Sequence, residues 1–189
     1  MPSDIPFFPL YPVLIKIVGW PFEARVDQAM WIGGILISVA ALTTAMLLYQ
    51  LAEDWLGSRA AARRTILYLA VFPFSFFFTR VYAESLFLLV SVMAVAGAYR
   101  GRWWSAGIWG GLTALTRPNG ILIGLPLVLK AVLDRPSLSV LARRLVALTL
   151  VPVGLGLSCL YCWDLTGDPL YWLQAEENWN YSVGNLPWE

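Results

Sequence analysis

The chain has 189 residues, of which 59% are hydrophobic and 13% are charged, and its mean hydropathy is +0.66. Soluble domains have about 45–50% apolar residues even when glycine is counted, so this composition indicates an integral membrane protein. A net charge of +1 and the absence of histidine argue against nucleic-acid binding and leave no histidine-based metal site, so we assign no metal ligand.

The first 30 residues are predicted to form an extracytoplasmic and interfacial segment. Five prolines interrupt this stretch, and the apolar run VLIKIVGW at 13–20 is too short to span a bilayer, which needs roughly 20 apolar residues. We therefore expect an interfacial helix that lies on the membrane, with Trp20 and Phe22 at the level of the lipid headgroups.

Residues 31–163 are predicted to form an all-α, polytopic transmembrane bundle of about six membrane segments. Residues 31–52 carry no charge and are the most secure span. The other apolar runs lie at about 65–79, 84–99, 103–116, 118–133 and 142–163. Several have only about 15 residues, or roughly 22 Å of helix, which is less than the roughly 30 Å hydrocarbon core. Their short connections must therefore dip toward the bilayer, where polar groups need shielding by protein or by a water-filled cavity.

Charge asymmetry orients these predicted segments. Nine of the 13 basic residues fall on one side if alternate connections are counted together: Arg59, Arg63, Arg64, Arg100, Arg102, Lys130, Arg135, Arg143 and Arg144. The other side holds nine of the 12 acidic residues. The positive-inside rule makes the basic side cytoplasmic and places both ends of the chain, including the tail at 164–189, on the extracytoplasmic side.

A polar group interrupts the apolar sequence at 72–84, FPFSFFFTRVYAE. Arg80, Tyr82 and Glu84 lie where two apolar runs meet, and ionisable groups at membrane depth are candidates for a functional site. Arg80 and Glu84 are four residues apart, so they pair structurally or face a ligand, and the residues alone leave both roles open.

The sequence TRPNG at 116–120 is a second candidate. Pro118 and Gly120 alone make an ordinary turn, whereas Arg117 beside Asn119 suits an anion, because a guanidinium binds phosphate through two parallel hydrogen bonds. The predicted layout places this turn, the FFPLYP sequence, residues 80–84 and the acidic, Trp-rich tail on one face, where we expect them to line one cavity.

Two pairs of glycines have the spacing GxxxG. Gly107 with Gly111, and Gly120 with Gly124, are expected to let helices approach closely, which is a packing role.

Four blocks together resemble the bacterial relatives of GPI mannosyltransferase II, the PIG-V type. In chain order they are FFPLYPVLIKIVG, FPFSFFFTRVYAESLFLL, RGRWWSAGIWGGLTALTRPNGILIGLP and GDPLYWLQAEENW. The matching positions are Phe7, Phe8, Pro9, Pro12, Tyr82, Glu84, Ser85, Arg117, Asn119 and Gly120. The resemblance implies an integral-membrane glycosyltransferase with a GT-C-like core. Such an enzyme transfers mannose from a polyprenyl- or dolichyl-phosphate donor to a lipid-linked or glycolipid acceptor, and the resemblance implies no tightly bound cofactor.

The resemblance also implies roles and a location. A carboxylate would take the proton of the acceptor hydroxyl, and a cation would stabilise the departing lipid phosphate. Arg117 and Arg80 are the candidates for the phosphate, and Glu84 would orient a sugar hydroxyl or hold Arg80. The site is expected on the extracytoplasmic face of a prokaryotic plasma membrane, or of the endoplasmic reticulum membrane in a eukaryote.

One departure from the family pattern affects catalysis. The family's WDA-like motif, with its presumed catalytic Asp, comes before the FFPxxP block, and Asp4 is too close to that block to match it. The catalytic residue is therefore not assigned, and we expect a fragment, a misplaced start codon or a degenerate paralogue, and a chain that is inactive alone. The alternative function is a non-catalytic membrane subunit that binds a lipid-linked sugar or packs against the helices of a membrane-protein partner. A transporter or channel segment is disfavoured, because the spans carry no path of charges.

Overall fold

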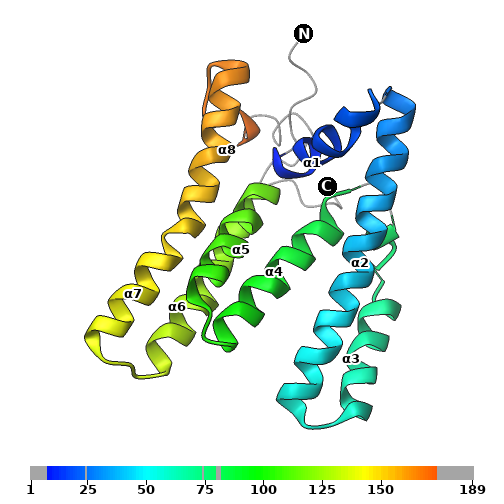
Figure 1. The fold of residues 1–189 in the computed structure, drawn as a ribbon. Coiled ribbons are helices and arrows are strands. Elements are labelled where there is room, and N and C mark those ends of the chain that lie inside the picture. Colours follow the sequence, from blue (N-terminus) through cyan, green and yellow to red (C-terminus); the bar gives the residue numbers. More distant parts are fainter. Residues whose placement is uncertain (1–7, 24, 74, 80–81, 174–189) are drawn as a thin grey trace, which may run out of the picture.

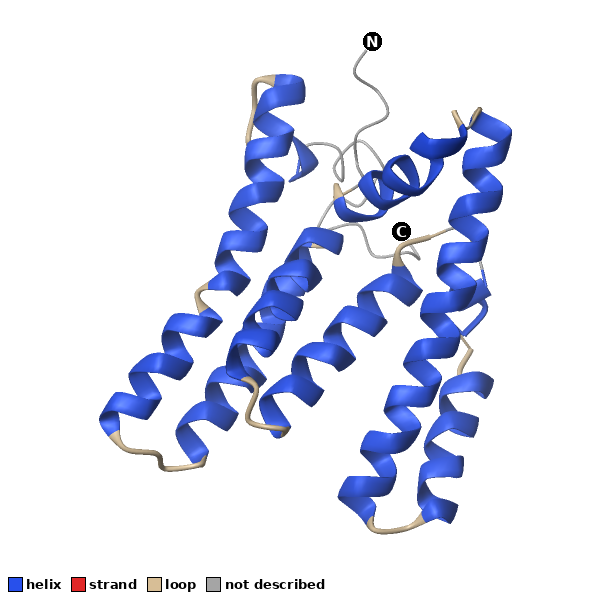
Figure 2. Cartoon of the chain, viewed as in Figure 1, coloured by secondary structure: helices blue, strands red, loops and turns tan. Residues whose placement is uncertain are grey.

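The computed structural model of the chain describes residues 8–23, 25–73, 75–79 and 82–173, and all regular structure in these ranges is helical (Figures 1 and 2). The all-α prediction is therefore confirmed. The elements, in chain order, are α1 (Leu10–Gly19), η1 (Trp20–Phe22), α2 (Val26–Leu56), α3 (Arg59–Val71), η2 (Ser75–Thr79), α4 (Glu84–Tyr99), α5 (Trp103–Thr116), η3 (Pro118–Ile123), α6 (Gly124–Leu133), α7 (Leu138–Leu148) and α8 (Leu150–Thr166), where η denotes a 3-10 helix.

Two helical stretches in the described residues are long and apolar enough to cross a membrane. They are Asp27–Leu56, which is most of α2, and Leu138–Thr166, which joins α7 to α8. The remaining apolar helices, such as α4 with 16 residues, are shorter. The expected count of about six spans is therefore not confirmed, and it stays a prediction.

Proline explains why one expected segment is shorter than the apolar run. The run at about 65–79 was expected to form one segment, but α3 ends at Val71, and η2 begins only at Ser75. Pro73 lacks a backbone N–H and disfavours helical dihedrals at the preceding residue; Phe72 accordingly has ψ 135°. The prediction of one continuous segment there is wrong, because it used hydropathy and neglected this proline.

From α2 onward the helices alternate in direction, with α7 and α8 continuing one another, and this places the predicted polar regions at one end. In Figure 1 the α2–α3, α4–α5 and α6–α7 connections lie at the lower end. The beginning of α4 and the ends of α5 and α8 lie toward the opposite, upper end, where α1 contacts α2 and α5 (Figure 1). The connections thus group as the charge count assumed. Trp20 and Phe22 are exposed, as an interfacial helix requires, and the interfacial location stays a prediction.

Small residues let the central helix, α5, approach its neighbours closely. A Cβ atom added to Gly107 would lie 2.8 Å from the carbonyl carbon of Ala147, and one added to Gly111 would lie 2.6 Å from the carbonyl oxygen of Leu150. Helices in a membrane gain little from hydrophobic burial against one another, so such close van der Waals contact is what holds them together. The packing role predicted for Gly107 and Gly111 is confirmed. The buried core consists of Ala94, Ala98, Ala106, Leu127, Ala131, Leu148 and Val151.

Charged and aromatic side chains join the helices at the lower end. Asp134 accepts from Lys130 at 2.5 Å and from Arg144 at 3.0 Å. The Arg144 guanidinium lies 4.6 Å from the centre of the Trp103 ring, and the Lys130 ammonium lies 5.0 Å from that of Tyr99. This cluster connects α4, α5, α6 and α7 at the end opposite the predicted site.

We predict different effects on stability for two alanine substitutions on α8. Gly154→Ala places a Cβ 2.9 Å from the Cα of Gly111, so it should lower the stability by about 1–3 kcal/mol. Gly156→Ala is the matched control, because among the described residues its added Cβ meets no atom within 4 Å apart from its chain neighbours and the adjacent backbone of α8; it should be neutral or stabilise by about 0.5–1 kcal/mol. Unfolding of both variants in the same detergent measures the difference, and equal stabilities would contradict the close α5–α8 contact.

The lower cluster predicts a dependence of stability on pH. The hydrogen bond from Lys130, followed by the Lys130 charge and by Arg144, lowers the pKa of Asp134. A lowered folded-state pKa contributes stability above the unfolded value, about 3.9, and this contribution is lost as the pH falls through the folded-state pKa. The Tm of the wild type should therefore exceed that of Asp134→Asn at neutral pH, and the gap should close under acidic conditions. A gap that widens on acidification would show that the sign is wrong.

Candidate functional site

The first part of the site is the beginning of α4. Glu84 lies in the first turn of this helix, where the helix dipole favours a carboxylate. The hydroxyl of the next residue, Ser85, is fully buried and donates to the carbonyl of Phe78 at 3.0 Å. This hydrogen bond connects η2, which contains part of the aromatic run, with the first turn of α4. Glu84 therefore lies toward the upper end of the bundle.

The second part is the turn between α5 and η3. Pro118 disfavours helical dihedrals at the preceding residue, and Arg117 is accordingly extended, with φ −157° and ψ 151°. A Cβ added to Gly120 would lie 2.7 Å from the Cα of Ala114, so only glycine lets the turn fold back on α5. The Thr116 hydroxyl donates to the carbonyl of Thr113 at 2.6 Å and closes the helix end. The sequence TRPNG thus fixes the position of the Arg117 backbone at the end of α5.

An ion pair joins these two parts. Nη2 of Arg117 donates to Oε1 of Glu84, which lies 33 residues earlier in the chain. The Glu84 side chain is 18% exposed and that of Arg117 is 43% exposed, so the carboxylate lies inside and the guanidinium reaches the surface. Oε2 of Glu84 is buried and accepts no hydrogen bond from the residues that the structure describes.

Among the described residues, the ion pair leaves N–H donors of Arg117 and one carboxylate oxygen of Glu84 available to a ligand. A guanidinium carries five N–H donors, and the bond to Glu84 uses one, so Arg117 can still hold an anion. Oε2 of Glu84, which has no partner among the described residues, can accept a hydrogen bond from a hydroxyl group. An anion and a hydroxyl are the groups of a phosphorylated sugar, and the pair presents a binding partner for each.

The other predicted site residues have separate positions. Tyr82 is exposed, and its ring meets that of Phe77 edge-on, with the centroids 6.0 Å apart. Asn119 is exposed on η3. Arg80 lies outside the described residues, and so does the predicted contact between Arg80 and Glu84. In the described part of the chain, no three His, Cys, Asp or Glu side chains are grouped in a way that holds a metal ion.

Sequence reasoning missed two contacts near this end. It did not pair Glu84 with Arg117, because no local spacing connects residues so far apart in the chain. It also did not pair Trp172 with Phe8, whose rings meet edge-on, at 5.8 Å between the centroids. This contact brings the FFPLYP and GDPLYW blocks together, and the resemblance, which includes both blocks, was the available signal. Burial raises the pKa of Tyr11 in FFPLYP to about 12, so this phenol stays protonated at neutral pH.

The fold and the site together define a helical, membrane-type protein with a carboxylate–guanidinium pair toward one end of its bundle. The profile of the mannosyltransferase (PIG-V) family matches residues 3–153, which include both members of the pair, and the chain belongs to this family. This confirms the family resemblance drawn from the polar blocks.

A curated relative agrees with this assignment. The chain is 33% identical over 117 residues to GPI mannosyltransferase 2 of Yarrowia lipolytica (strain CLIB 122 / E 150), in an alignment that covers 57% of this chain and 33% of the relative. The chain thus spans about a third of the length of that relative. No solved structure matches the chain.

Proposed function

We propose that the Glu84–Arg117 pair binds a lipid-linked mannose donor, a polyprenyl- or dolichyl-phosphate mannose, in a membrane mannosyltransferase. The observation that carries this proposal is the pair itself, in which a half-exposed guanidinium is held by a more buried carboxylate. Membership of the mannosyltransferase (PIG-V) family supports a glycosyl transfer, and the relative named GPI mannosyltransferase 2 supports mannose as the sugar.

In the proposed reaction, an acceptor hydroxyl gives its proton to a carboxylate, which is not assigned in this chain, and its oxygen attacks the anomeric carbon of mannose. The bond between that carbon and the oxygen of the lipid phosphate breaks, and the lipid phosphate leaves. Negative charge develops on the phosphate as it leaves, and a fixed cation at that position stabilises the transition state. Arg117 supplies this cation, with Arg80 as the second candidate. The buried oxygen of Glu84 accepts a hydrogen bond from a sugar hydroxyl, while its other oxygen keeps the guanidinium in place.

The remaining predicted residues and the location complete the proposal. Tyr82 and Asn119 are exposed polar groups on the elements that carry Glu84 and Arg117, and we assign them to contacts with the sugar or the phosphate. The acceptor is a lipid-linked sugar or a glycolipid, and the site faces the extracytoplasmic side of a plasma membrane or the lumen of the endoplasmic reticulum. The predicted excess of basic residues at the opposite end supports this orientation.

Substitution of Arg117 tests the proposal by donor binding, which does not require catalysis. In lipid nanodiscs, Arg117→Ala should weaken binding of labelled polyprenyl-phosphate mannose about 10- to 100-fold, because a charge-assisted hydrogen bond is worth about 1.5–3 kcal/mol. Arg117→Lys should retain part of the affinity, since lysine keeps the charge but loses the planar fork.

A matched control comes from the opposite end of the bundle. Arg59 also pairs with a glutamate, Glu53, at 2.9 Å, and Arg59→Ala should leave the donor affinity unchanged. Equal affinities of the wild type and Arg117→Ala would contradict the proposal. Donor binding without mannose transfer would favour the non-catalytic alternative.

A further inference from the structure

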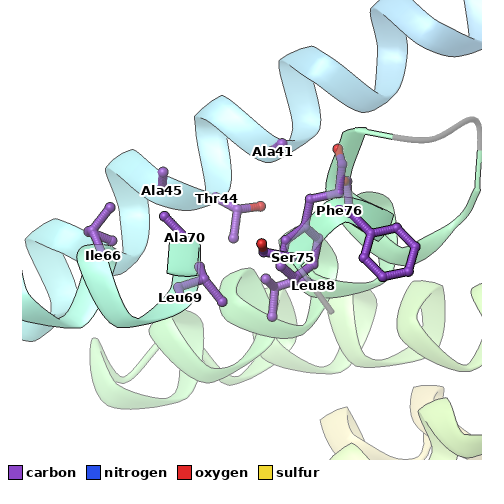
Figure 3. Close-up of a pocket in the computed structure, with 11 residues that line it drawn as sticks. Ala41, Thr44, Ala45, Ile66, Leu69, Ala70, Ser75, Phe76 and Leu88 are labelled. Atoms are coloured by element: carbon purple, nitrogen blue, oxygen red, sulfur yellow. The ribbon is translucent and has the colours of Figure 1, made fainter. Parts of the chain in front are cut away.

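An apolar groove lies between α2, α3, η2 and α4, beside the beginning of α4 (Figure 3). Its volume is about 340 Å³, within the range of about 300–1,000 Å³ that is usual for small-molecule sites. The lining residues include Ala41, Thr44, Leu69, Phe76, Ser85 and Leu88. Phe76 is half exposed, so the groove reaches the surface at η2.

The wall of this groove favours a hydrocarbon. Its two buried hydroxyls already donate within the protein: Thr44 donates to the carbonyl of Ala40 at 2.7 Å, and Ser85 donates to that of Phe78 at 3.0 Å. The labelled side chains around them in Figure 3 are mainly alanine, isoleucine, leucine and phenylalanine, which offer no hydrogen bond to a polar ligand; Ser75 adds a third hydroxyl to an otherwise apolar lining. A chain of methylene and methyl groups is therefore the chemistry that this wall accommodates.

The groove and the ion pair share one turn of helix. Ser85 lines the groove, and its neighbour Glu84 holds Arg117. Successive residues of an α-helix are about 100° apart around the axis and about 1.5 Å apart along it, so the two sites occupy adjoining faces of the first turn of α4. An anion at Arg117 and a hydrocarbon in the groove can therefore be the two parts of one amphiphilic molecule, whose negatively charged headgroup pairs with the guanidinium.

We infer that this groove binds the hydrocarbon chain of the lipid phosphate whose headgroup lies at Arg117. The inference rests on the proposed function and extends it, because it assigns the donor's chain to the space between α2, α3, η2 and α4. The phosphate supplies the negative charge for Arg117, and the first isoprene units displace water or bilayer lipid from the groove.

A substitution that fills the groove tests the inference. Ala41→Phe should weaken binding of a long-chain polyprenyl phosphate about tenfold or more, because the larger side chain occupies part of the groove. Each methylene of the ligand that is kept out of the groove lowers the affinity about fourfold. It should change the affinity for inorganic phosphate little. Leu42→Phe, on the neighbouring exposed face of α2, is the matched control and should bind both ligands as the wild type does.

This experiment tests the phosphate site and the groove separately. Arg117→Ala should weaken binding of both ligands, which tests the phosphate site of the proposed function. If Arg117→Ala has this effect while Ala41→Phe binds the long-chain phosphate like Leu42→Phe, the groove inference is overturned and the proposed function stands. Gel filtration of each variant in detergent excludes misfolding as the cause.

Photo-crosslinking gives a readout that does not depend on substitution. A polyprenyl phosphate with a diazirine in its first isoprene units should label Leu69, Phe76 or Leu88 in the wild-type chain. The corresponding polyprenol, which lacks the phosphate, should label them much less. Equal labelling by the two probes would mean that the groove takes any bilayer hydrocarbon, and labelling spread over the exposed helix faces would mean that it holds no chain; either result overturns the inference.

Discussion

Close contact between the backbones of α5 and α8 is the constraint on which the rest of the structure depends. Gly111 and Gly154 meet where neither position has room for a side chain. Apolar side chains outside this seam are no better buried against another helix than against lipid, so dispersion contacts at short range supply the specificity. Because α5 packs against α4 as well as α8, the seam sets where the end of α5 lies relative to the beginning of α4.

The ion pair follows from that placement. Arg117 comes one residue after α5 and Glu84 begins α4, so two helix ends must be held next to each other before the pair can form. Proline produces one of these ends, because Pro118 stops α5 at Thr116. The beginning of α4 is held by the hydrogen bond from Ser85 to the carbonyl of Phe78 in η2. A carboxylate that is mostly buried needs a counter-charge, and the pair supplies one while leaving the outer part of the guanidinium accessible.

Much of the helical layout could be predicted from the sequence. The runs at 84–99 and 103–116 match α4 and α5, because charged or glycine-containing turns mark their ends. Hydropathy failed where proline divides an apolar run, as it does after Val71. The GxxxG spacing of Gly107 and Gly111 indicated close packing, but spacing alone does not name the partner helix.

The site was only partly predictable, for a physical reason. Charged residues in apolar surroundings identify themselves in a sequence, so Glu84 and Arg117 were both found. Their mutual contact depends on how α4 packs against α5, and local periodicity carries no information on packing between helices. The family resemblance grouped the two blocks functionally without giving their geometry.

The most direct measurement is donor binding by a charge-swapped variant, Glu84→Arg with Arg117→Glu. The swap keeps opposite charges in contact and so preserves a structural pair, but it moves the cation from the accessible position to the more buried one. Our account predicts a folded protein that does not bind polyprenyl-phosphate mannose. Binding equal to that of the wild type would contradict the account, because it would mean that the two charges only neutralise each other and that neither binds the donor.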